Sequence, residues 1–546
     1  MKIAKLRIGN FRSFGPEQAE LDLAGGPGYF VVVGPNATGK SNLLEAVRWV
    51  TLDKAIGGDF IEPWDFHKGQ TESTLKIEAE LNPPLKRGDT FNKFSDVALL
   101  RLEAKEYKVA QDKGSIRCDH PALTVEGKQI MTSQAIPLAK GRTLTEEEKE
   151  GKQAARPLFV RDIKERIPIY YLDNASYGYH LTMGRGSLMS RLARILHDDL
   201  IRDDNRIEWR GRTCTRAEAI DDILSDLANL LKTDRASAFL EVMATFLAAQ
   251  LQIPKDSVAL EIGLPRGMDL LRKLDLLGRD SADVPTMPMD RLGRGYSALG
   301  IVALFRALNG LDEEHQGSII LIEEPEMFLG PHLRSLFAAT LQTFAIHGNQ
   351  VILVTHSAEF FNPVNPETAI LLRKHNGATQ CVQWPQVAKT PTFDVTLKFI
   401  EPNLNRLIFS KRILFVEGDD DYAAVTAALE LLSLTPAYHG LEVLRLGGNG
   451  NIVHLVPYAQ NFRILHAALL DADAKSILEG VDATGKSWRL MEPDLEGVLN
   501  TTKQKHNSVQ VAQTVKSFGS WLNLETACPR FTTPLKELLV FLGITI

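Results

Sequence analysis

The stretch YFVVVGPNATGKSNLLEAVRWV, residues 29–50, decides the fold of the N-terminal part of this chain. Residues 29–34 form a short run of β-branched and aromatic residues, as is typical of a strand buried on both faces. GPNATGKS at residues 34–41 fits the pattern G-x-x-x-x-G-K-[ST], and an amphipathic stretch follows it. A chance match in a glycine-rich turn is the alternative. Strand, turn and helix in this order instead predict a P-loop, which binds nucleotide phosphates.

Each part of this turn has an expected role toward ATP and Mg²⁺. Backbone amides of the turn and of the helix N-terminus surround phosphate oxygens. Lys40 would meet the charges of the β- and γ-phosphates, and the Ser41 hydroxyl would be a ligand of Mg²⁺. The predicted nucleotide-binding residues of the turn are Asn36, Ala37, Thr38, Gly39, Lys40 and Ser41.

Two later apolar runs end in polar residues that suit the same site. SIILIEEPE, residues 318–326, ends in paired carboxylates: Glu323 would hold Mg²⁺ through water, and Glu324 would polarise the attacking water. VILVTHS, residues 351–357, ends in His356, the expected sensor of the γ-phosphate. Solvated strand ends are the alternative interpretation, but the order of these motifs favours an ATPase site.

The segment MDRLGRGYSALGIVALFRAL, residues 289–308, has the form of an ABC signature. In such a signature, the N-terminus of a helix in one subunit caps the γ-phosphate bound by another. The segment departs from the usual LSGGQ, and its matching elements include Gly295 and Ser297, which we expect to contact nucleotide. A plain helix start is the alternative.

The separation of the P-loop from this signature resembles the SMC, RecF and Rad50-like ATPases. The opening LRIGNFRSFG, residues 6–15, is similar to the usual beginning of these proteins, and Arg12 within it is expected to approach the nucleotide. The resemblance implies ATP-dependent dimerisation of the nucleotide heads. Three stretches within residues 187–255 have apolar residues at helical spacing, and they either pack on the parent domain or form a dimer interface.

The C-terminal region has a second cluster of acidic residues. ILFVEGDDDYAAV, residues 413–425, begins an alternation of strand and helix patterns, which predicts parallel strands whose carboxyl ends collect ligands. Glu417 ends one strand, while Asp471 and Asp473 end a later one, so these side chains should converge. The Cα atoms of Asp471 and Asp473 would lie about 6.6 Å apart on one face. That spacing suits carboxylates that bracket two divalent ions, although turn chemistry is the alternative.

The order E-G-x-x-[DE] and then D-x-D is similar to the TOPRIM fold of topoisomerases, primases and certain nucleases. By that resemblance Glu417 is a general base or metal ligand, and Asp421 holds a second ion. The metal ligands that the resemblance implies are Glu417, Asp421, Asp471 and Asp473. Asp419 and Asp420 do not match the pattern and are expected to be helix N-terminal charges favoured by the dipole.

The chain is thus expected to be α/β, with an ABC-type (RecF/SMC-like) ATPase head, a helical insert and a C-terminal Rossmann-like TOPRIM domain. The expected boundaries are 1–186 and 256–388 for the two parts of the head, 187–255 for the insert, 389–410 for a linker and 411–546 for the TOPRIM domain. An ATPase head followed by a TOPRIM domain resembles the OLD (overcoming lysogenization defect) family of ATP-dependent nucleases.

The OLD resemblance adds a further glutamate and a lysine to the expected site. Glu496 in DLEGVL matches the glutamate as a metal ligand, and Lys503 or Lys505 matches a lysine that stabilises phosphate charge, with Lys505 assigned to catalysis. A solvated loop is the alternative for either lysine. The chain departs from the family at Asn449, where a lysine is expected, and in PEMFLGP, which lacks a histidine usual after the Walker B strand.

The resemblance implies an ATP-regulated, divalent-metal-dependent DNA endonuclease that uses two Mg²⁺ or Mn²⁺ ions and serves antiphage defence. It also implies a homodimer or a higher even-numbered oligomer, with a helicase or a retron reverse transcriptase as a possible type of partner. The alternative function is a RecF-like ATP switch whose TOPRIM domain only binds DNA.

Bulk composition restricts these expectations. The 62 basic and 68 acidic residues give a net charge of −6, so any DNA contact has to come from a local patch. The four cysteines are scattered without zinc-ligand spacing. There is no signal-peptide pattern and no run of about 18 apolar residues, so a cytoplasmic protein without a membrane partner is expected.

Overall fold

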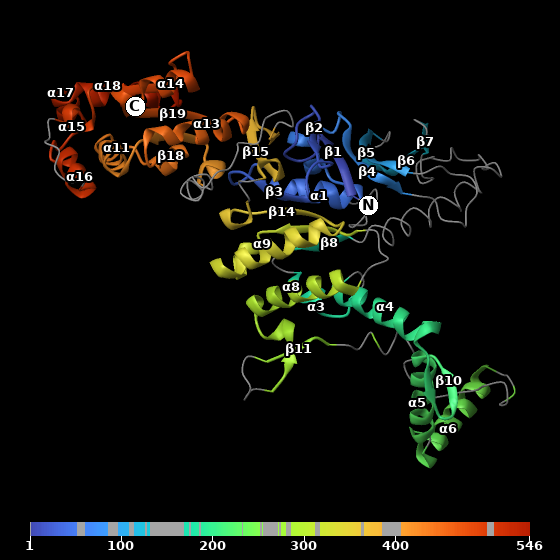
Figure 1. Cartoon of the computed structure of the whole chain (residues 1–546). Coiled ribbons are helices and arrows are strands. Elements are labelled where there is room, and N and C mark those ends of the chain that lie inside the picture. The colour runs from blue at the N-terminus through green and yellow to red at the C-terminus, as the bar shows by residue number, and fades with distance from the viewer. Residues whose placement is uncertain are drawn as a thin grey trace. The chain divides into compact units, whose positions relative to one another are not determined.

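The computed structural model describes most of the chain (Figure 1). The described residues are 2–51, 61–85, 97–108, 114–125, 128–130, 169–173, 176–184, 187–231, 233–251, 254, 271, 275–279, 285–311, 317–361, 365–384, 406–499 and 507–546. The chain divides into a first unit, Met1–Ile169 with Gln316–Ile546, and a second unit, Tyr170–His315. Within the described residues, no helix is long and apolar enough to cross a membrane.

The first unit begins with an antiparallel sheet in the order β2-β1-β4-β5-β6-β7. Its strands are β1 (Lys2–Gly9), β2 (Ala19–Asp22), β4 (Leu75–Leu85), β5 (Val97–Lys108), β6 (Gly114–Val125) and β7 (Lys128–Ile130). In β1, Ile3, Leu6 and Ile8 are buried, while the charged side chains between them are half-buried. This sheet supports the turn at residues 9–15, which lies against the nucleotide-binding loop.

The P-loop belongs to a second, mainly parallel sheet, whose strands in the first unit run β16-β15-β3-β14-β13. These strands are β3 (Tyr29–Val33), β13 (Ile319–Glu323), β14 (Gln350–Val354), β15 (Ala369–His375) and β16 (Ala378–Gln383). Every residue of β3 and of β14 is buried, as their continuous apolar sequences predict. Helices α1 (Lys40–Val50) and α9 (Pro331–Ile346) follow β3 and β13. Strands β13 and β14 run parallel to β3, so the carboxyl ends of all three strands lie at the edge of the sheet that carries the P-loop.

The second unit is mainly helical. Its elements are β8 (Ile169–Leu172, which enters it), α3 (Tyr177–Leu181), α4 (Leu188–Ile201), β9 (Ile207–Trp209), β10 (Arg212–Cys214), α5 (Arg216–Leu231), α6 (Asp234–Leu251), β11 (Leu277–Gly278), β12 (Met287–Pro288) and α8 (Arg294–Leu311). Helices α4, α5 and α6 are the three helical stretches expected within residues 187–255. A small β9–β10 hairpin, which was not expected, separates α4 from α5, and its turn has positive φ at Arg210 (51°) and Gly211 (77°).

The C-terminal part of the first unit contains a wholly parallel sheet in the order β18-β17-β19-β20, drawn in orange and red in Figure 1. Its strands are β17 (Arg412–Val416), β18 (Leu441–Arg445), β19 (Leu465–Asp471) and β20 (Trp488–Met491). Its helices are α11 (Asp419–Leu431), α12 (Pro436–His439), α13 (Ile452–Asn461), α14 (Lys475–Val481), α15 (Leu495–Val498), α16 (Ser508–Lys516), α17 (Trp521–Ala527) and α18 (Pro529–Phe541). The alternation predicted from residue 411 is therefore present.

Helices α16 to α18 extend the core of this sheet. Leu414 of β17 and Leu469 of β19 share one buried cluster with Phe531 and Leu535 of α18. Burying such large side chains stabilises the sheet by about 1.5–3 kcal/mol each before conformational entropy is subtracted. The strands are thereby held in the register that brings their carboxyl ends, and the acidic residues on them, to one edge.

Candidate nucleotide and metal sites

The P-loop adopts a backbone that depends on its glycines. Gly34 has a φ of 147° and Gly39 a φ of 100°, in the region that L side chains rarely adopt. A Cβ at Gly34 would collide with the carbonyl oxygen of Leu372, and one at Gly39 with the hydroxyl of Ser13. Glycine is therefore required at both positions by close packing as well as by backbone conformation.

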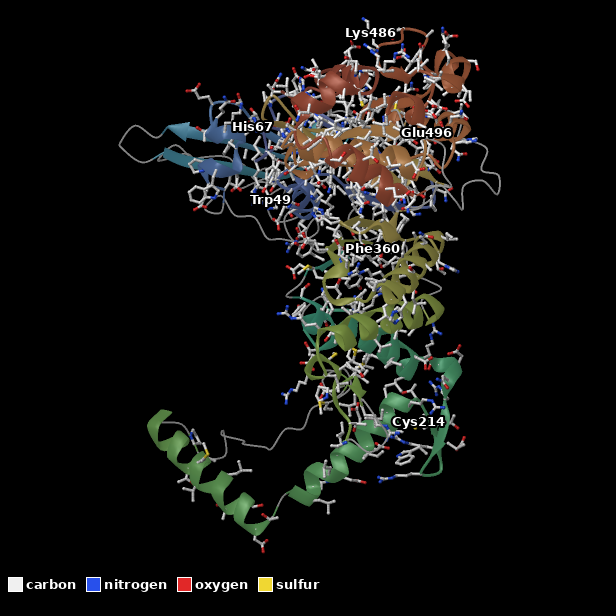
Figure 2. The ribbon with its side chains drawn as sticks, turned by 90° about the vertical axis from the view of Figure 1, so that its left-hand side faces the viewer. Trp49, His67, Cys214, Phe360, Lys486 and Glu496 are labelled. Carbon is white, nitrogen blue, oxygen red and sulfur yellow. The ribbon has the colours of Figure 1, made fainter. Side chains whose placement is uncertain are left out.

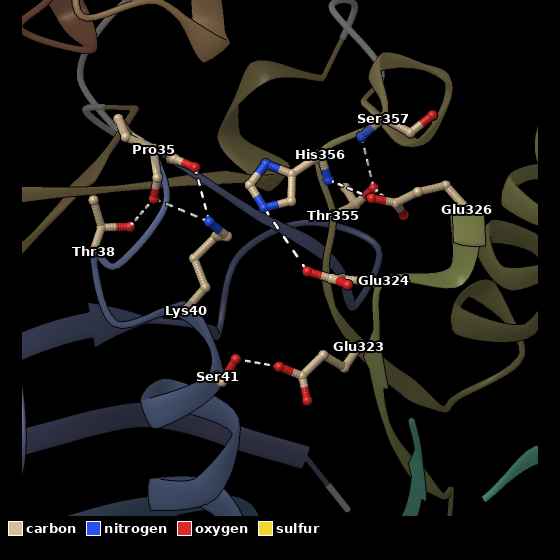
Figure 3. Close-up of polar contacts among 11 residues, drawn as sticks. Pro35, Thr38, Lys40, Ser41, Glu323, Glu324, Glu326, Thr355, His356 and Ser357 are labelled. Atoms are coloured by element: carbon tan, nitrogen blue, oxygen red, sulfur yellow. Dashed lines mark hydrogen bonds and ion pairs between the residues drawn. The ribbon is translucent and has the colours of Figure 1, made fainter. Parts of the chain in front are cut away.

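Lys40 and Thr38 are bonded to the loop that carries them (Figure 3). Lys40 Nζ donates to the carbonyl oxygens of Gly34 (2.9 Å) and Pro35 (3.0 Å), and Thr38 Oγ1 donates to Pro35 O (2.8 Å). Burial lowers the pKa of Lys40, while three nearby glutamates of the β13 edge act in the opposite direction. The lysine is thus held inside the turn that is expected to surround phosphate.

A threonine that sequence reasoning missed also supports the loop. Thr379 on β16 donates from Oγ1 to Thr38 O (2.6 Å), and its backbone N–H donates to Ser13 O (2.7 Å). Thr379 is buried and lies 341 residues from Thr38 in sequence. Only the tertiary fold brings these groups together, so no local pattern indicated the contact.

The end of β13 faces the P-loop as predicted. The Ser41 hydroxyl donates a hydrogen bond to the Glu323 carboxylate. Mg²⁺ prefers hard oxygen ligands such as hydroxyls and carboxylates, so Ser41 and Glu323 suit the roles predicted for them at a Mg²⁺ ion. His356 Nε2 lies 3.9 Å from Glu324 Oε1. Burial and then Lys40 lower the pKa of His356, whereas Glu326 and Glu324 raise it.

Arg12 has close partners of its own. Its Nε donates to Asp65 Oδ1 (2.9 Å), and its guanidinium lies over the rings of Phe11 (5.1 Å) and Trp49 (5.5 Å), the latter labelled in Figure 2. The pair of ring contacts and the ion pair fix the side chain at the start of the head. The expected approach of Arg12 to nucleotide stays a prediction.

The two signature residues lie at the start of α8 in the second unit. Ser297 is buried, and its Oγ donates to Gly293 O (3.2 Å) and lies 3.5 Å from Met289 O. Gly295 is half-buried in the first turn. The Ser297 hydroxyl is thus bonded within its own helix start, and the expected contact of these residues with nucleotide stays a prediction.

The second candidate site lies at the carboxyl edge of the C-terminal sheet. Glu417 follows β17, and Asp471 ends β19, which is hydrogen-bonded to β17. The backbone N–H groups of Gly447 and Gly448 donate to Glu417 O (2.9 and 3.2 Å). Asn449, which stands where the family has a lysine, donates from Nδ2 to Asp473 Oδ1 (3.1 Å). The glycine turn thus holds both acidic segments.

Like charges gather at this edge. Burial raises the pKa of Glu417, and Asp421 and Asp473 raise it further. Burial also raises the pKa of Asp471 to about 7, with added contributions from Asp421, Glu417, Asp494 and Glu496. Glu417 and the DxD pair thus contribute to one another's raised pKa values, and their convergence into one metal site stays a prediction.

Two carboxylate oxygens at this edge are buried without a hydrogen-bond partner among the described residues: Glu417 Oε2 and Asp421 Oδ1. The other oxygen of Asp421, Oδ2, accepts from Gly418 N–H (2.9 Å) and so caps α11. Asp421 therefore combines two roles that were predicted for different residues, a helix cap and a candidate metal ligand. Asp419 pairs instead with Arg445, consistent with its expected place outside the metal site.

These two oxygens suit a bound cation, because without a partner the free-energy cost of removing a carboxylate oxygen from water is not offset. Within the described residues, however, no group of three or more His, Cys, Asp or Glu side chains is arranged so that it could hold a metal ion. Glu496, on α15 (Figure 2), is near enough to raise the pKa of Asp471 and Asp421, whereas Lys503 and Lys505 lie outside the described residues.

Models of three known protein families match parts of this chain. The model for the "Overcoming lysogenization defect protein-like, TOPRIM domain" matches residues 408–473, an AAA domain matches 5–175 and an AAA ATPase domain matches 192–361. The chain is 25% identical over 491 residues to an OLD nuclease of Thermus scotoductus, covering 88% of this chain and 84% of that protein. It is 25% identical over 205 residues to the Old nuclease of Escherichia phage P2, covering 35% of each.

Solved structures of SMC heads are also similar. An SmcHead bound to the C-winged helix domain of ScpA aligns with a TM-score of 0.40 and 13% identity, covering 71% of this chain and 98% of that one. The SMC head domain of Thermotoga maritima aligns with a TM-score of 0.31 and 15% identity, covering 70% and 99%.

The matched models define a P-loop ATPase that carries a C-terminal TOPRIM domain. This combination resembles that of the OLD proteins, and the predicted resemblance is confirmed by 25% identity to an OLD nuclease over 88% of the chain and by the match to the OLD-like TOPRIM model.

Proposed function

We propose that this chain is an ATP-regulated, divalent-metal-dependent DNA endonuclease that acts in antiphage defence. The observation that carries the nuclease assignment is the set of mutually repelling carboxylates, with two orphaned oxygens, inside the region that matches the OLD-like TOPRIM model. The 25% identity to an OLD nuclease over 88% of the chain supports it.

In this proposal the acidic residues of the TOPRIM domain hold divalent ions, Mg²⁺ or Mn²⁺. The ligands would be Glu417, Asp421, Asp471, Asp473 and Glu496. Such ions supply activation of a water molecule and stabilisation of the leaving 3′ oxygen. Groups of the protein would orient this site: Asn449 Nδ2 donates to Asp473, and the backbone amide of Leu495 donates to Asp471 Oδ1 (3.1 Å). Glu417 would accept a proton from water.

The head would control this chemistry through ATP. Lys40 and the P-loop amides would bind the phosphates, Ser41 and Glu323 would hold Mg²⁺, and Glu324 would polarise the attacking water. A second copy of the chain would supply Gly295 and Ser297, so we propose a homodimer or a larger even-numbered oligomer. A helicase or a retron reverse transcriptase is the kind of further partner that fits this proposal.

A RecF-like ATP switch is the second candidate, and one observation favours it. The described carboxylates do not form a preassembled group of three metal ligands. If the TOPRIM domain only bound DNA, such a group would not be needed.

Plasmid nicking separates the two functions. Full-length protein is incubated with supercoiled plasmid and Mg²⁺ or Mn²⁺, with and without ATP, and with EDTA as a control. We expect metal-dependent nicking that Asp471→Ala removes while ATP binding remains. Asp419→Ala is the matched control, because Asp419 is exposed and paired with Arg445, and it should nick like the wild type. Metal-dependent cleavage retained by Asp471→Ala would rule the nuclease assignment out.

A further inference from the structure

The backbone bends sharply where β13 ends, directly beside the predicted γ-phosphate sensor. Glu324 has φ 47° and ψ 56°, a left-handed conformation that is unfavourable for a residue with a Cβ. Its N–H donates to Val354 O (2.8 Å) on β14. Such a strained turn persists only when surrounding contacts hold it, and it occurs preferentially at functional sites.

The third glutamate of the EEPE sequence, Glu326, makes two of those contacts (Figure 3). Its Oε2 accepts from Thr355 Oγ1 (2.7 Å), and its Oε1 accepts from the backbone N–H of His356 (2.6 Å). Thr355 is fully buried, and its Oγ1 also accepts from Ser357 N–H (2.9 Å). One carboxylate thus bonds two consecutive residues after β14, with charge-assisted hydrogen bonds.

These bonds determine where the His356 imidazole lies. The ring projects between Lys40 of the P-loop and Glu324, the two groups expected to act on the γ-phosphate and on the attacking water. A shift of about 1 Å in such a group can reduce the rate about a hundredfold even though the group remains present. The His356 backbone has a direct side-chain anchor in Glu326.

We propose that Glu326 is a positioning residue of the ATPase site: its carboxylate fixes the backbone at Thr355 and His356 and thereby holds the imidazole beside Glu324. The inference rests on the proposed ATP hydrolysis. Its role differs from those of Glu323 and Glu324, because both oxygens of Glu326 are used within the protein.

Steady-state ATP hydrolysis by the full chain tests the role in the reaction. Glu326→Ala should lower kcat about tenfold to a hundredfold with KM for ATP changed less than about threefold. Glu326→Gln should restore most of kcat, because its amide oxygen can accept from His356 N–H and its amide nitrogen can donate to Thr355 Oγ1. The matched control is Glu359→Ala: Glu359 is on the same loop, but its carboxylate accepts from the Ser357 hydroxyl and lies 3.8 Å from Arg334. The control should keep kcat.

Amide hydrogen exchange of the segment 350–360, followed by mass spectrometry, tests the contact without depending on activity. Exchange at His356 should accelerate in Glu326→Ala, remain slow in Glu326→Gln and remain slow in Glu359→Ala. Unchanged exchange in Glu326→Ala, or equal loss of kcat in all three variants, overturns the proposal. If the wild type did not hydrolyse ATP but exchange at His356 accelerated in Glu326→Ala, the proposed ATPase function would be refuted. The structural role of Glu326 in fixing the His356 backbone would still be supported.

Discussion

The two candidate sites occupy the same topological position but differ in how their charged side chains are paired. Each lies where parallel strands end, as ligand sites in open α/β sheets do. In the head, Lys40 lies among three glutamates, and Ser41, Thr355 and His356 bond to those carboxylates. In the TOPRIM domain, burial raises the pKa of Glu417, and the neighbouring groups that raise it further are carboxylates.

The difference indicates whether each site needs a bound ion to offset the charges of its side chains. The head residues satisfy one another, so its geometry is already organised by internal hydrogen bonds. The TOPRIM carboxylates repel one another, and orphaned oxygens on Glu417 and Asp421 add to the imbalance. A bound cation would remove both penalties there. We therefore expect the head to respond mainly to lost hydrogen bonds and the TOPRIM site mainly to changes of charge.

Lys40→Ala should have the largest effect in the head. It removes the cation that the P-loop directs at phosphate, so ATP hydrolysis should fall about 10²- to 10³-fold. Metal-dependent nicking measured without ATP should persist, because the acidic site does not use Lys40. Lys374→Ala, whose ammonium donates to Gly377 O (3.4 Å), is the control and should hydrolyse ATP normally. Normal hydrolysis by Lys40→Ala would contradict the phosphate role.

Asn449→Ala tests how the TOPRIM site is oriented. Removing the amide that donates to Asp473 should decrease metal-dependent cleavage about 10- to 100-fold, as loss of other outer-shell partners does. Raising the metal concentration should recover part of this loss. Asn461→Ala removes an amide bonded to Pro457 O (2.9 Å) and should leave cleavage unchanged. Equal cleavage by Asn449→Ala and wild type would show that Asp473 needs no such support.

The pH dependence of stability tests the cost of burying Asp471 beside other carboxylates. The pKa of Asp471 is raised from 3.8 to about 7 in the folded protein. The folded state therefore binds this proton more tightly than the unfolded state, and stability decreases as pH rises from about 4 to about 7 and then levels off. Without added metal at pH 8, Asp471→Asn should melt about 2–4 °C above wild type. The difference should shrink at pH 5.

Metal addition completes that test. At pH 8, Mg²⁺ or Mn²⁺ should raise the melting temperature of the wild type, because a cation relieves the repulsion, and should raise that of Asp471→Asn much less. An equal metal effect on both proteins would mean that Asp471 is not a ligand.

Local sequence patterns predicted the parts of each site that lie on single elements. The P-loop, the end of β13 and the DxD pair each follow an apolar strand, and parallel topology brings strand ends together. The convergence of Glu417 with Asp471 could be predicted for that reason. The β-alternation rule was wrong for the DxD pair, because the strand ends at Asp471 and residues 472–474 form a 3-10 helix, so Asp473 does not lie in an extended segment.

The remaining contacts depend on residues far apart in sequence. Thr379 reaches Thr38 across 341 residues, and Glu326 reaches Thr355 across 29. Hydrogen-bond partners at such separations follow from strand order and side-chain conformation, which a local pattern does not contain. The capping role of Asp421 was missed for a different reason: a carboxylate has two oxygens, and Asp421 can cap a helix with one while the other remains a candidate metal ligand.

Thr379→Val should have the smallest effect. It retains the shape of the side chain but leaves Thr38 O without its buried donor (2.6 Å), which corresponds to about 1 kcal/mol, or about fivefold weaker ATP binding. Isothermal titration with a non-hydrolysable ATP analogue measures it. The control is Thr343→Val on α9, whose hydroxyl also donates to a backbone carbonyl, Ala339 O (2.9 Å), but at an exposed position.

A fivefold loss in Thr379→Val with no loss in Thr343→Val would show that the head is organised by many modest internal bonds. Removing one of these bonds then decreases the affinity for ATP only slightly. In the TOPRIM site, by contrast, removing a single carboxylate decides whether a cation can bind and neutralise the remaining carboxylates. If Thr379→Val instead bound ATP as the wild type does, the glycines and Lys40 alone would have to hold the P-loop. The two sites would then differ only in their charged groups, a lysine among glutamates in the head and carboxylates alone in the TOPRIM domain.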